Sequence, residues 1–352
     1  MGYRIGFDIG STTIKAVVLD ENNQICYKSY ERHKAQVRQK ALDKLVELKK
    51  YTKEPFKFAI SGSGALGLSE QGELPFVQEV FASATGVSKL YPETDCAIEL
   101  GGEDAKILFF QGSVEQRMNS TCAGGTGAFI DQMATLLNMS LEEMNEASLN
   151  YHRLYPIASR CGVFAKTDIQ PLINQGVDKC DLCASIFQAV VDQTITSLAQ
   201  GRKIEGNILF LGGPLYFMSG LRNRFVETLK LSDVQVNCPD TAINFVALGT
   251  AICADQEYTY DELYKALEDL VHAPAKLTES KPLFESEEDY QKFIERHKSH
   301  DAKYADLKNY AGKAYLGIDS GSTTTKLVLL DENDAILYDS YTSNKGNPLD
   351  VV

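Results

Sequence analysis

The chain of 352 residues lacks any run of 18 apolar residues, and its first residues lack a basic segment followed by an apolar one. The first absence argues against a membrane span, and the second argues against an export signal. Positive charge is also scarce, because 48 acidic residues outnumber 35 Lys and Arg and leave a net charge of −13. This balance disfavours nucleic acid and anionic membranes as partners. We therefore expect a cytoplasmic protein.

Cysteine and histidine are too few and too scattered for the commonest structural sites. The eight cysteines form no compact disulfide framework, and the five histidines show no metal spacing. In a cytoplasmic chain the thiols are expected to be reduced, so each cysteine is core filler, metal ligand or redox centre. Cys180 and Cys183 form a C-x-x-C pair with no second pair nearby, and we expect it to be structural. The histidines are expected at surface or cap positions.

What the chain does contain is a repeated segment. Residues 6–30 and 317–341 align without a gap, and 16 of the 25 residues are identical. Both copies carry Asp-x-Gly-Ser-Thr-Thr, headed by Asp8 in the first copy and Asp319 in the second. Only 26 residues follow Lys326 of the second copy. We therefore expect the chain to be the N-terminal piece of a longer tandem protein.

The hydrophobic pattern predicts an α/β fold with two related lobes. Short strands joined by tight turns are predicted at 3–7, 14–19 and 24–30, and again at 95–100, 105–110 and 113–118. Helices are predicted at 33–51, 75–90 and 181–201, among others. We expect one domain over 1–254, with lobe I at about 1–92 and lobe II at about 93–254. After this domain we expect a charged helical connector over 255–313, and then the start of a second domain over 314–352. This last segment is too short to bury a core and should be poorly ordered or covered by a neighbour.

Three glycine turns follow predicted strands and suit a nucleotide. In the first, Gly10 lets the backbone approach a phosphate, and the N–H and hydroxyl groups of Ser11 and Thr12 can donate to its oxygens. The following strand adds Thr13 and Lys15 as candidates. The second turn repeats this logic with Gly101 and Gly102, and the third would let adenine lie against the backbone of Gly212 and Gly213.

Acidic residues accompany the first two turns. A carboxylate cannot face phosphate without repulsion, so Asp8 is expected to hold Mg²⁺ through water. Asp8, Glu99 and Glu103 are the candidates to orient the attacking water or the metal, and the residues alone do not rank them.

The order of the three turns resembles the actin, sugar-kinase and Hsp70 ATPase superfamily, which implies duplicated ribonuclease H-like lobes around ATP or ADP. Within it, residues 6–15, 99–106 and 119–131 resemble the ATP-dependent activators of 2-hydroxyacyl-CoA dehydratases, which are similar to the ATPase subunits of benzoyl-CoA reductase. The likeness covers about residues 3–254. A long form of this family carries two ATPase modules in tandem, which implies that residues 314–352 begin a second ATPase domain.

Two cysteines lie just before predicted helices, where the helix dipole favours anionic sulfur. From position alone, Cys122 and Cys161 could equally be small buried hydrophobes. The resemblance implies that they ligate a [4Fe–4S] cluster. Such a cluster needs four thiolates, so a homodimer would supply the other two. The turn that follows Cys122 adds three candidate cofactor contacts, Gly125, Thr126 and Gly127.

The resemblance implies an ATPase that donates one electron to a 2-hydroxyacyl-CoA dehydratase or a related CoA-ester reductase. Its cofactors would be ATP, Mg²⁺ and a shared [4Fe–4S] cluster, and ferredoxin or flavodoxin would be the electron donor. Two alternatives stay open. A small-molecule kinase of the same fold, such as an amino-sugar kinase, would need a catalytic Asp but neither cysteine. A nucleotide-switched regulatory protein without a redox role would tolerate Cys→Ser changes.

Overall fold

The computed structural model describes residues 2–119, 125–158, 162–274, 282–298, 300–321, 324–343 and 351–352. The chain divides into two compact units, Met1–Pro274 and Ala275–Val352. The first unit holds two sheets of five strands each, and the second holds one sheet of three strands.

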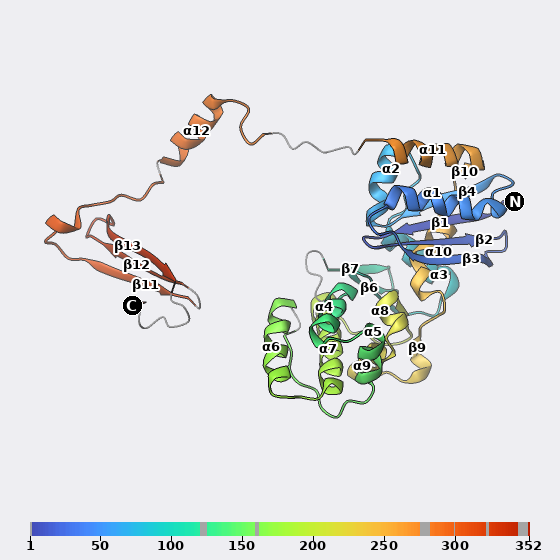
Figure 1. Ribbon diagram of the computed structural model, residues 1–352, viewed down its shortest axis with the longest axis horizontal. Helices are drawn as coiled ribbons and strands as arrows, with labels where there is room; N and C mark the ends of the chain where they lie inside the picture. The colour runs from blue at the N-terminus through green and yellow to red at the C-terminus, as the bar shows by residue number, and fades with distance from the viewer. Residues whose placement is uncertain are drawn as a thin grey trace. The chain divides into compact units, whose positions relative to one another are not determined.

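The two sheets of the first unit share one strand plan (Figure 1). Across the lobe I sheet the order is β10 (Glu257–Tyr258), β4 (Phe56–Ser61), β1 (Arg4–Ile9), β2 (Thr13–Leu19) and β3 (Ile25–Arg32). Across the lobe II sheet the order is β9 (Val236–Asn237), β8 (Ile208–Leu211), β5 (Cys96–Leu100), β6 (Ala105–Phe109) and β7 (Glu115–Met118). In each, the first strand of the meander pairs antiparallel with the next strand and parallel with a later one.

Two helices lie between the sheets and form a central layer, α3 (Glu79–Leu90) and α10 (Phe245–Cys253) (Figure 1). Their core joins Val17 of the lobe I sheet to Leu108 of the lobe II sheet. The packing is close at Gly6 of β1, where a Cβ would lie 2.3 Å from the backbone oxygen of Ala247 and from the backbone nitrogen of Ala251. Glycine is therefore required there, because backbone atoms of α10 cannot give way.

The outer face of each sheet is covered by a separate set of helices. Lobe I carries α1 (Val37–Glu47), α2 (Leu66–Gly72) and α11 (Tyr260–His272). Lobe II carries α4 (Gly127–Leu137), α5 (Leu141–Ser148), α6 (Gly162–Asn174), α7 (Lys179–Thr194), α8 (Gly213–Phe217) and α9 (Ser219–Leu229). The result is five alternating layers, helix–sheet–helix–sheet–helix.

Helix α11 corrects the expected domain boundary at residue 254. Leu263, Leu267 and Leu270 are buried in the outer core of lobe I, and their spacing places them on one helix face. Thr259 and Glu262 form a capping box that fixes the start of the helix. Because these leucines are buried, residues 255–272 belong to lobe I and not to a solvated connector. The charged composition of this region concealed the apolar face from prediction.

Two predicted helices begin later than their patterns indicated. The helix predicted at 33–51 begins at Val37 and ends in a 3₁₀ turn, Leu48–Tyr51. The helix predicted at 75–90 begins at Glu79, because the residues before it hydrogen-bond along β4, with the Val77 N–H donating to the Ile60 carbonyl at 2.8 Å. The segment 179–199 has the length and apolar character to cross a membrane, but 72% of its most apolar stretch of 18 residues is buried, as expected of a core helix.

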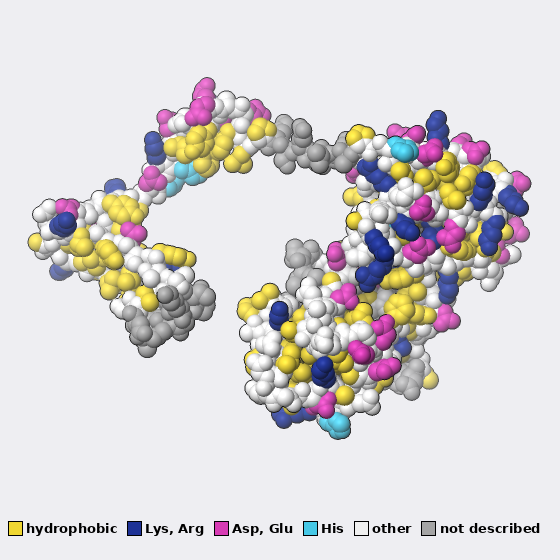
Figure 2. Space-filling model, in the orientation of Figure 1, with side chains coloured by type: hydrophobic (Ala, Val, Ile, Leu, Met, Phe, Trp, Pro, Cys, Tyr) yellow, Lys and Arg dark blue, Asp and Glu magenta, His cyan; other side chains and the backbone are white. Residues whose placement is uncertain are grey.

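In the second unit, α12 (Glu287–Lys298) precedes an antiparallel meander of β11 (Tyr315–Ser320), β12 (Thr324–Leu330) and β13 (Ile336–Ser343). The described residues of this segment form paired strands, and whether the segment is poorly ordered or covered by a neighbour stays a prediction. Several of its apolar side chains, Leu316 and Ile318 among them, are nevertheless exposed, and Figure 2 shows apolar side chains on the surface.

Candidate nucleotide site

The ends of β1 and β5 present acidic side chains to the central layer. Alternation along β1 sends Ile9 into the outer core of lobe I and leaves Asp8 on the opposite face. In β5, Ile98 and Leu100 lie in the outer core of lobe II, so Glu99 also faces inward. Two candidate catalytic residues, both buried, therefore approach the same layer from different sheets.

Each of these acids has a lysine directly opposite on the next strand. Asp8 is in register with Lys15, whose Nζ lies 2.7 Å from the Asp8 Oδ2. Glu99 is in register with Lys106, at 3.5 Å. Residues opposite each other in an antiparallel ladder are close enough for ion pairs. Sequence reasoning singled out Lys15 but missed Lys106, although both follow their acid by seven positions.

Electrostatics keep both lysines charged. Burial lowers the pKa of Lys15, but attraction to Asp8, with a smaller pull from Glu99, raises it overall. Burial also lowers the pKa of Lys106, yet Glu99, Asp104 and other carboxylates hold it well above its ordinary value. In contrast, burial raises the pKa of Glu99, and Lys106 opposes that rise only in part. Glu99 is therefore the carboxyl suited to taking up a proton.

Turn one, residues 10–13, is closed by a hydrogen bond from the Gly10 N–H to the Thr13 carbonyl at 2.9 Å. His33 supports it, because its Nε2 lies 3.0 Å from the Gly10 carbonyl oxygen. The His33 Nδ1 accepts from the Ala35 N–H at 3.2 Å. A carbonyl can only accept and an amide can only donate, so the proton is on Nε2.

His33 is buried, contrary to the surface or cap position expected. Its carbonyl partner, on Gly10, lies too far away in sequence to be predicted. Ser11 and Thr12 remain exposed at the tip of the turn.

The glycine turn after β4 packs against turn one. A Cβ on Gly62, which has φ +100°, would lie 2.2 Å from the Ile9 carbonyl oxygen and 2.8 Å from the Asp8 Oδ1. A Cβ on Gly64 would lie 2.8 Å from the Gly10 carbonyl oxygen. Both positions therefore require glycine. Sequence reasoning gave these two glycines no role.

Turn two, residues 101–104, lies opposite turn one. A Cβ on Gly102 would lie 3.6 Å from the Thr12 Oγ1 and 4.0 Å from the Ser11 Oγ. The turn is closed by the Gly101 N–H, which donates to the Asp104 carbonyl at 2.8 Å. The third candidate acid, Glu103, is exposed in this turn. The predicted phosphate contacts of the two lobes thus face each other.

Helix α4 is bonded to turn two at its first residues. The Gly127 N–H donates to the Gly101 carbonyl at 2.9 Å, and the Ala128 N–H donates to the Gly102 carbonyl at 2.8 Å. Thr126, at the N-cap, is fully buried, and Gly125 before it has φ +82°. This helix start and turn two therefore form one packed element.

Turn three, residues 212–214, completes the cluster. Gly212 has φ +87°, and a Cβ there would lie 2.0 Å from the Leu100 carbonyl oxygen. A Cβ on Gly127 would lie 3.3 Å from the Pro214 Cγ, so turn three also contacts the start of α4. Gly213 faces lobe I, because its Cβ would lie 3.7 Å from the Tyr30 hydroxyl. The structure brings all three predicted turns together.

Cys122 and Cys161 lie outside the described residues, in the gaps 120–124 and 159–161. The helices that follow them are described, and they touch at their first turns, since a Cβ on Gly162 would lie 3.4 Å from the Phe129 ring. Among the described residues, no three or more His, Cys, Asp or Glu side chains could hold a metal ion together. Cys183 is buried, and burial raises its pKa to about 12, which does not suit a redox thiolate.

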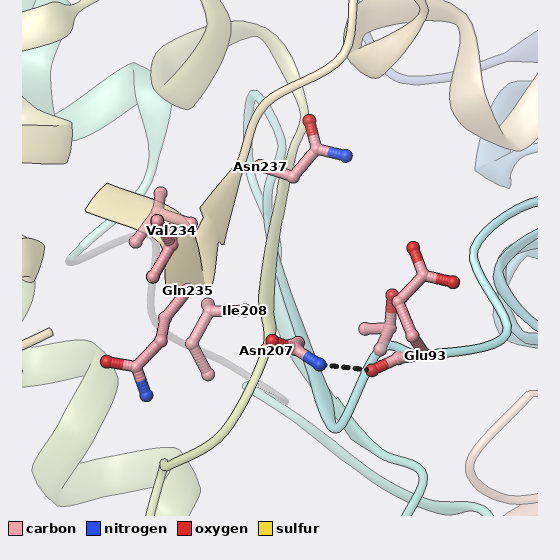
Figure 3. Close-up of a pocket in the computed structure, with 8 residues that line it drawn as sticks. Glu93, Asn207, Ile208, Val234, Gln235 and Asn237 are labelled. Carbon is pink, nitrogen blue, oxygen red and sulfur yellow. Dashed lines mark hydrogen bonds between the residues drawn. The ribbon is translucent and has the colours of Figure 1, made fainter. Parts of the chain in front are cut away.

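A separate hollow lies away from the three turns (Figure 3). It is lined by Val234 and Gln235 and by Asn207, whose Nδ2 donates to the Glu93 carbonyl at 2.8 Å. Ile208, also in the lining, begins β8, whose other end leads into turn three. The hollow is thus at the opposite end of the sheet from the candidate nucleotide site.

The two sheets have the same strand order and lie on either side of a central helix layer. Beside this layer, glycine turns and acid–lysine pairs from the two sheets face each other. These features define the two-lobed fold of actin-like and sugar-kinase ATPases. The chain belongs to the BadF/BadG/BcrA/BcrD ATPase family, which matches residues 5–254.

Individual relatives agree with this assignment. The 2-hydroxyisocaproyl-CoA dehydratase activator of Clostridioides difficile is 27% identical over 266 residues, 74% of this chain and 96% of the relative. The crystal structure of Acidaminococcus fermentans (R)-2-hydroxyglutaryl-CoA dehydratase component A matches with a TM-score of 0.64 and 25% identity, covering 76% of this chain and 100% of that one. The Clostridium difficile activator structure with bound ADPNP matches with a TM-score of 0.62 and 26% identity, covering 77% and 98%. The resemblance to dehydratase activators and the predicted fold class are confirmed.

Proposed function

We propose that this chain is a cytoplasmic ATPase that donates one electron to a 2-hydroxyacyl-CoA dehydratase or a related CoA-ester reductase. The observation that carries the proposal is the pair of opposed glycine turns, each backed by a buried acid–lysine pair, in a chain whose relatives are dehydratase activators. Phosphoryl transfer requires positioning and charge neutralisation more than a strong base, and this arrangement supplies both.

Each turn is assigned one part of the nucleotide. Ser11 and Thr12, exposed in turn one, would donate to phosphate oxygens from lobe I, together with the backbone at Gly10. The backbone at Gly101 and Gly102 would do so from lobe II. Turn three would leave room for adenine against the backbone of Gly212 and Gly213, where no side chain intervenes.

The buried acids have different proposed roles. Asp8 offers hard carboxylate oxygens beside turn one and would hold Mg²⁺ through water, as this cation prefers. Glu99 would orient the attacking water and take up its proton, because it faces the central layer and burial raises its pKa. Glu103 is exposed and is the weakest of the three candidates. Lys15, bonded to Asp8, adds fixed positive charge where the phosphates would lie.

Cys122 and Cys161 are the proposed cluster ligands. When bound, a [4Fe–4S] cluster supplies a one-electron centre held by four thiolates. A second copy of the chain would supply the other two thiolates. The contact between the starts of α4 and α6 supports convergence of the two cysteine segments. Val163 and Phe164 lie two and three residues after Cys161 and are 72% and 65% exposed, which suits burial against a second copy.

Nucleotide binding has a direct mechanical route to the cysteine segment. The first two N–H groups of α4 are bonded to the carbonyls of turn two, so a shift of that turn on nucleotide binding would move the helix start. Such ligand-driven movement of one packed element is a common way to gate a later step. The electron would come from reduced ferredoxin or flavodoxin and would leave to the dehydratase or reductase component.

Iron and sulfide analysis with EPR on anaerobically purified protein tests this function. We expect about four irons per dimer, an EPR signal on reduction, and loss of both in Cys122→Ser and Cys161→Ser. Cys26→Ser is the matched control, because that thiol is exposed in another lobe. Retention of iron in both test variants would contradict the redox function, and ATP hydrolysis in the same samples would then favour a regulatory or kinase role.

A further inference from the structure

We propose that Glu79 is a positioning residue that ties turn one to turn two and so sets the affinity for MgATP. The proposal rests on the proposed function only in taking MgATP as the ligand. It concerns a residue outside all three glycine turns, at the first position of α3 in the central layer.

The Glu79 carboxylate bonds to both lobes. One oxygen accepts from the Ser63 N–H at 3.1 Å, and the other bonds the Lys106 ammonium. Ser63 lies between Gly62, which packs against the last residue of β1, and Gly64, which packs against the Gly10 carbonyl of turn one. Lys106 is on β6, the strand that follows turn two. One side chain thus links the support of turn one to the strand behind turn two.

The charges around Lys106 show why this link matters. Its side chain is 2% exposed and is bonded by three carboxylates, those of Glu79, Glu99 and Asp104. Two of these come from lobe II itself, so Glu79 is not needed to neutralise the ammonium. Its distinctive contribution is that it comes from α3 and reaches the other lobe.

A second contact from the same helix strengthens the link. Ser83 donates its Oγ hydrogen to the Glu99 Oε2 at 3.0 Å and is fully buried. Glu79 and Ser83 are four residues apart and therefore lie on one helix face. Helix α3 accordingly bonds both members of the lobe II acid–lysine pair. Glu79 bonds Lys106, and Ser83 donates to Glu99. The range of spacings between the two turns is then restricted before the nucleotide arrives, which reduces the ordering cost of binding.

Glu79→Gln is the informative variant, because it keeps the shape and an acceptor for the Ser63 N–H while removing the charge that holds Lys106. We expect the Kd of MgADPNP and the KM for MgATP to rise about tenfold, since small misplacements of binding groups cost that much or more. The value of kcat should stay within about twofold. Glu79→Asp keeps the charge and should recover part of the lost affinity.

Calorimetric titration of the full chain with MgADPNP, steady-state ATP hydrolysis and thermal unfolding without nucleotide provide the three readouts. Glu70→Gln, an exposed change on α2, is the matched control and should alter none of them. Unchanged affinity in Glu79→Gln would overturn the proposal, and so would a lower thermal midpoint with unchanged Kd, since that indicates a purely structural role. If the unaltered chain binds no MgADPNP, the proposed function and this inference fail together. If it binds and Glu79→Gln binds equally, only this inference fails.

Discussion

The molecule contains one meander twice, and the first copy is far more deeply buried than the second. Ile5 and Phe7 of β1 are fully buried, whereas Leu316 and Ile318, at the same places in β11, are 61% and 48% exposed. Both copies nevertheless form the same antiparallel pairs. The repeated sequence therefore adopts the same strand register in both surroundings. Burial depends on what packs onto it, which in lobe I is β4 at the edge and helices on both faces.

The two copies also share an acid–lysine pair with different surroundings. Lys326 lies 2.6 Å from Asp319, almost the same separation as between Lys15 and Asp8. The Asp8 side chain is 4% exposed, whereas that of Asp319 is 66% exposed. The hairpin register creates the pair in both copies, but only the first pair is removed from water. An equal geometry therefore does not imply an equal contribution to stability.

The largest difference is expected at the repeated glycine. Gly6→Val would push a side chain into the backbone of α10, and we expect the free energy of unfolding of the first unit to fall by about 3 kcal/mol. Gly317→Val has open space, since a Cβ there would meet only the Val328 carbonyl oxygen at 3.8 Å, and should change little. Denaturant unfolding followed by circular dichroism measures both, and equal losses would contradict the comparison.

The buried ion pair should respond almost as strongly. Lys15→Met leaves the Asp8 carboxylate buried without its partner, which typically costs about 3 kcal/mol of unfolding free energy. Lys326→Met removes an exposed pair and should have no measurable effect on unfolding. The same denaturation experiment distinguishes them. A stable Lys15→Met protein would mean that water or another group reaches Asp8.

The third difference concerns activity. Asp8→Asn should reduce kcat/KM for ATP hydrolysis about 100-fold, the usual scale for losing one electrostatic group in such a site. Asp319→Asn should leave hydrolysis unchanged, because the described residues of the second unit place no second lobe opposite that turn. A phosphate-release assay on both variants tests this, and a loss in Asp319→Asn would assign nucleotide chemistry to the second copy.

The smallest effect is expected at the lobe II pair and depends on pH. Burial raises the pKa of Glu99, so the unfolded chain loses this proton at lower pH than the folded chain does. The contribution of Glu99 to the free energy of unfolding is therefore greatest below the pKa of its unfolded state. This contribution is lost as pH rises through the pKa of the folded state. Glu99→Gln should therefore raise the thermal midpoint by about 2 °C at pH 8 and by less at pH 5. Calorimetry at the two pH values checks this, and a larger gain in thermal midpoint at pH 5 would contradict the direction of the pKa shift. Glu99→Gln should still reduce ATP hydrolysis, because it removes the group proposed to take up the proton.

The sequence predicted those features that depend on neighbouring residues. The glycine turns at Gly10, Gly101 and Gly212 follow apolar strands directly, so both the fold class and the grouping of the turns could be predicted. Glu79 could not, because its partner Lys106 is 27 positions away and meets it only through the packing of α3. The region of helix α11 was predicted to be helical, but the burial of its single apolar face was concealed by the charged residues around it. The roles assigned to Cys122 and Cys161 stay predictions.

The spacing of seven residues from acid to lysine restricts how the phosphate turns can change in length. In an antiparallel hairpin, a slip of one residue moves every following side chain to the other face of the sheet. A single insertion in turn one would therefore send Lys15 toward the outer core and replace it, opposite Asp8, with a neighbour of the wrong chemistry. The same restriction on length applies to turn two, because Lys106 must stay opposite Glu99. Variation in these turns is consequently confined to exchanging side chains, whereas turn three has no such lysine partner in the described ladder and is restricted instead by its close packing against Leu100.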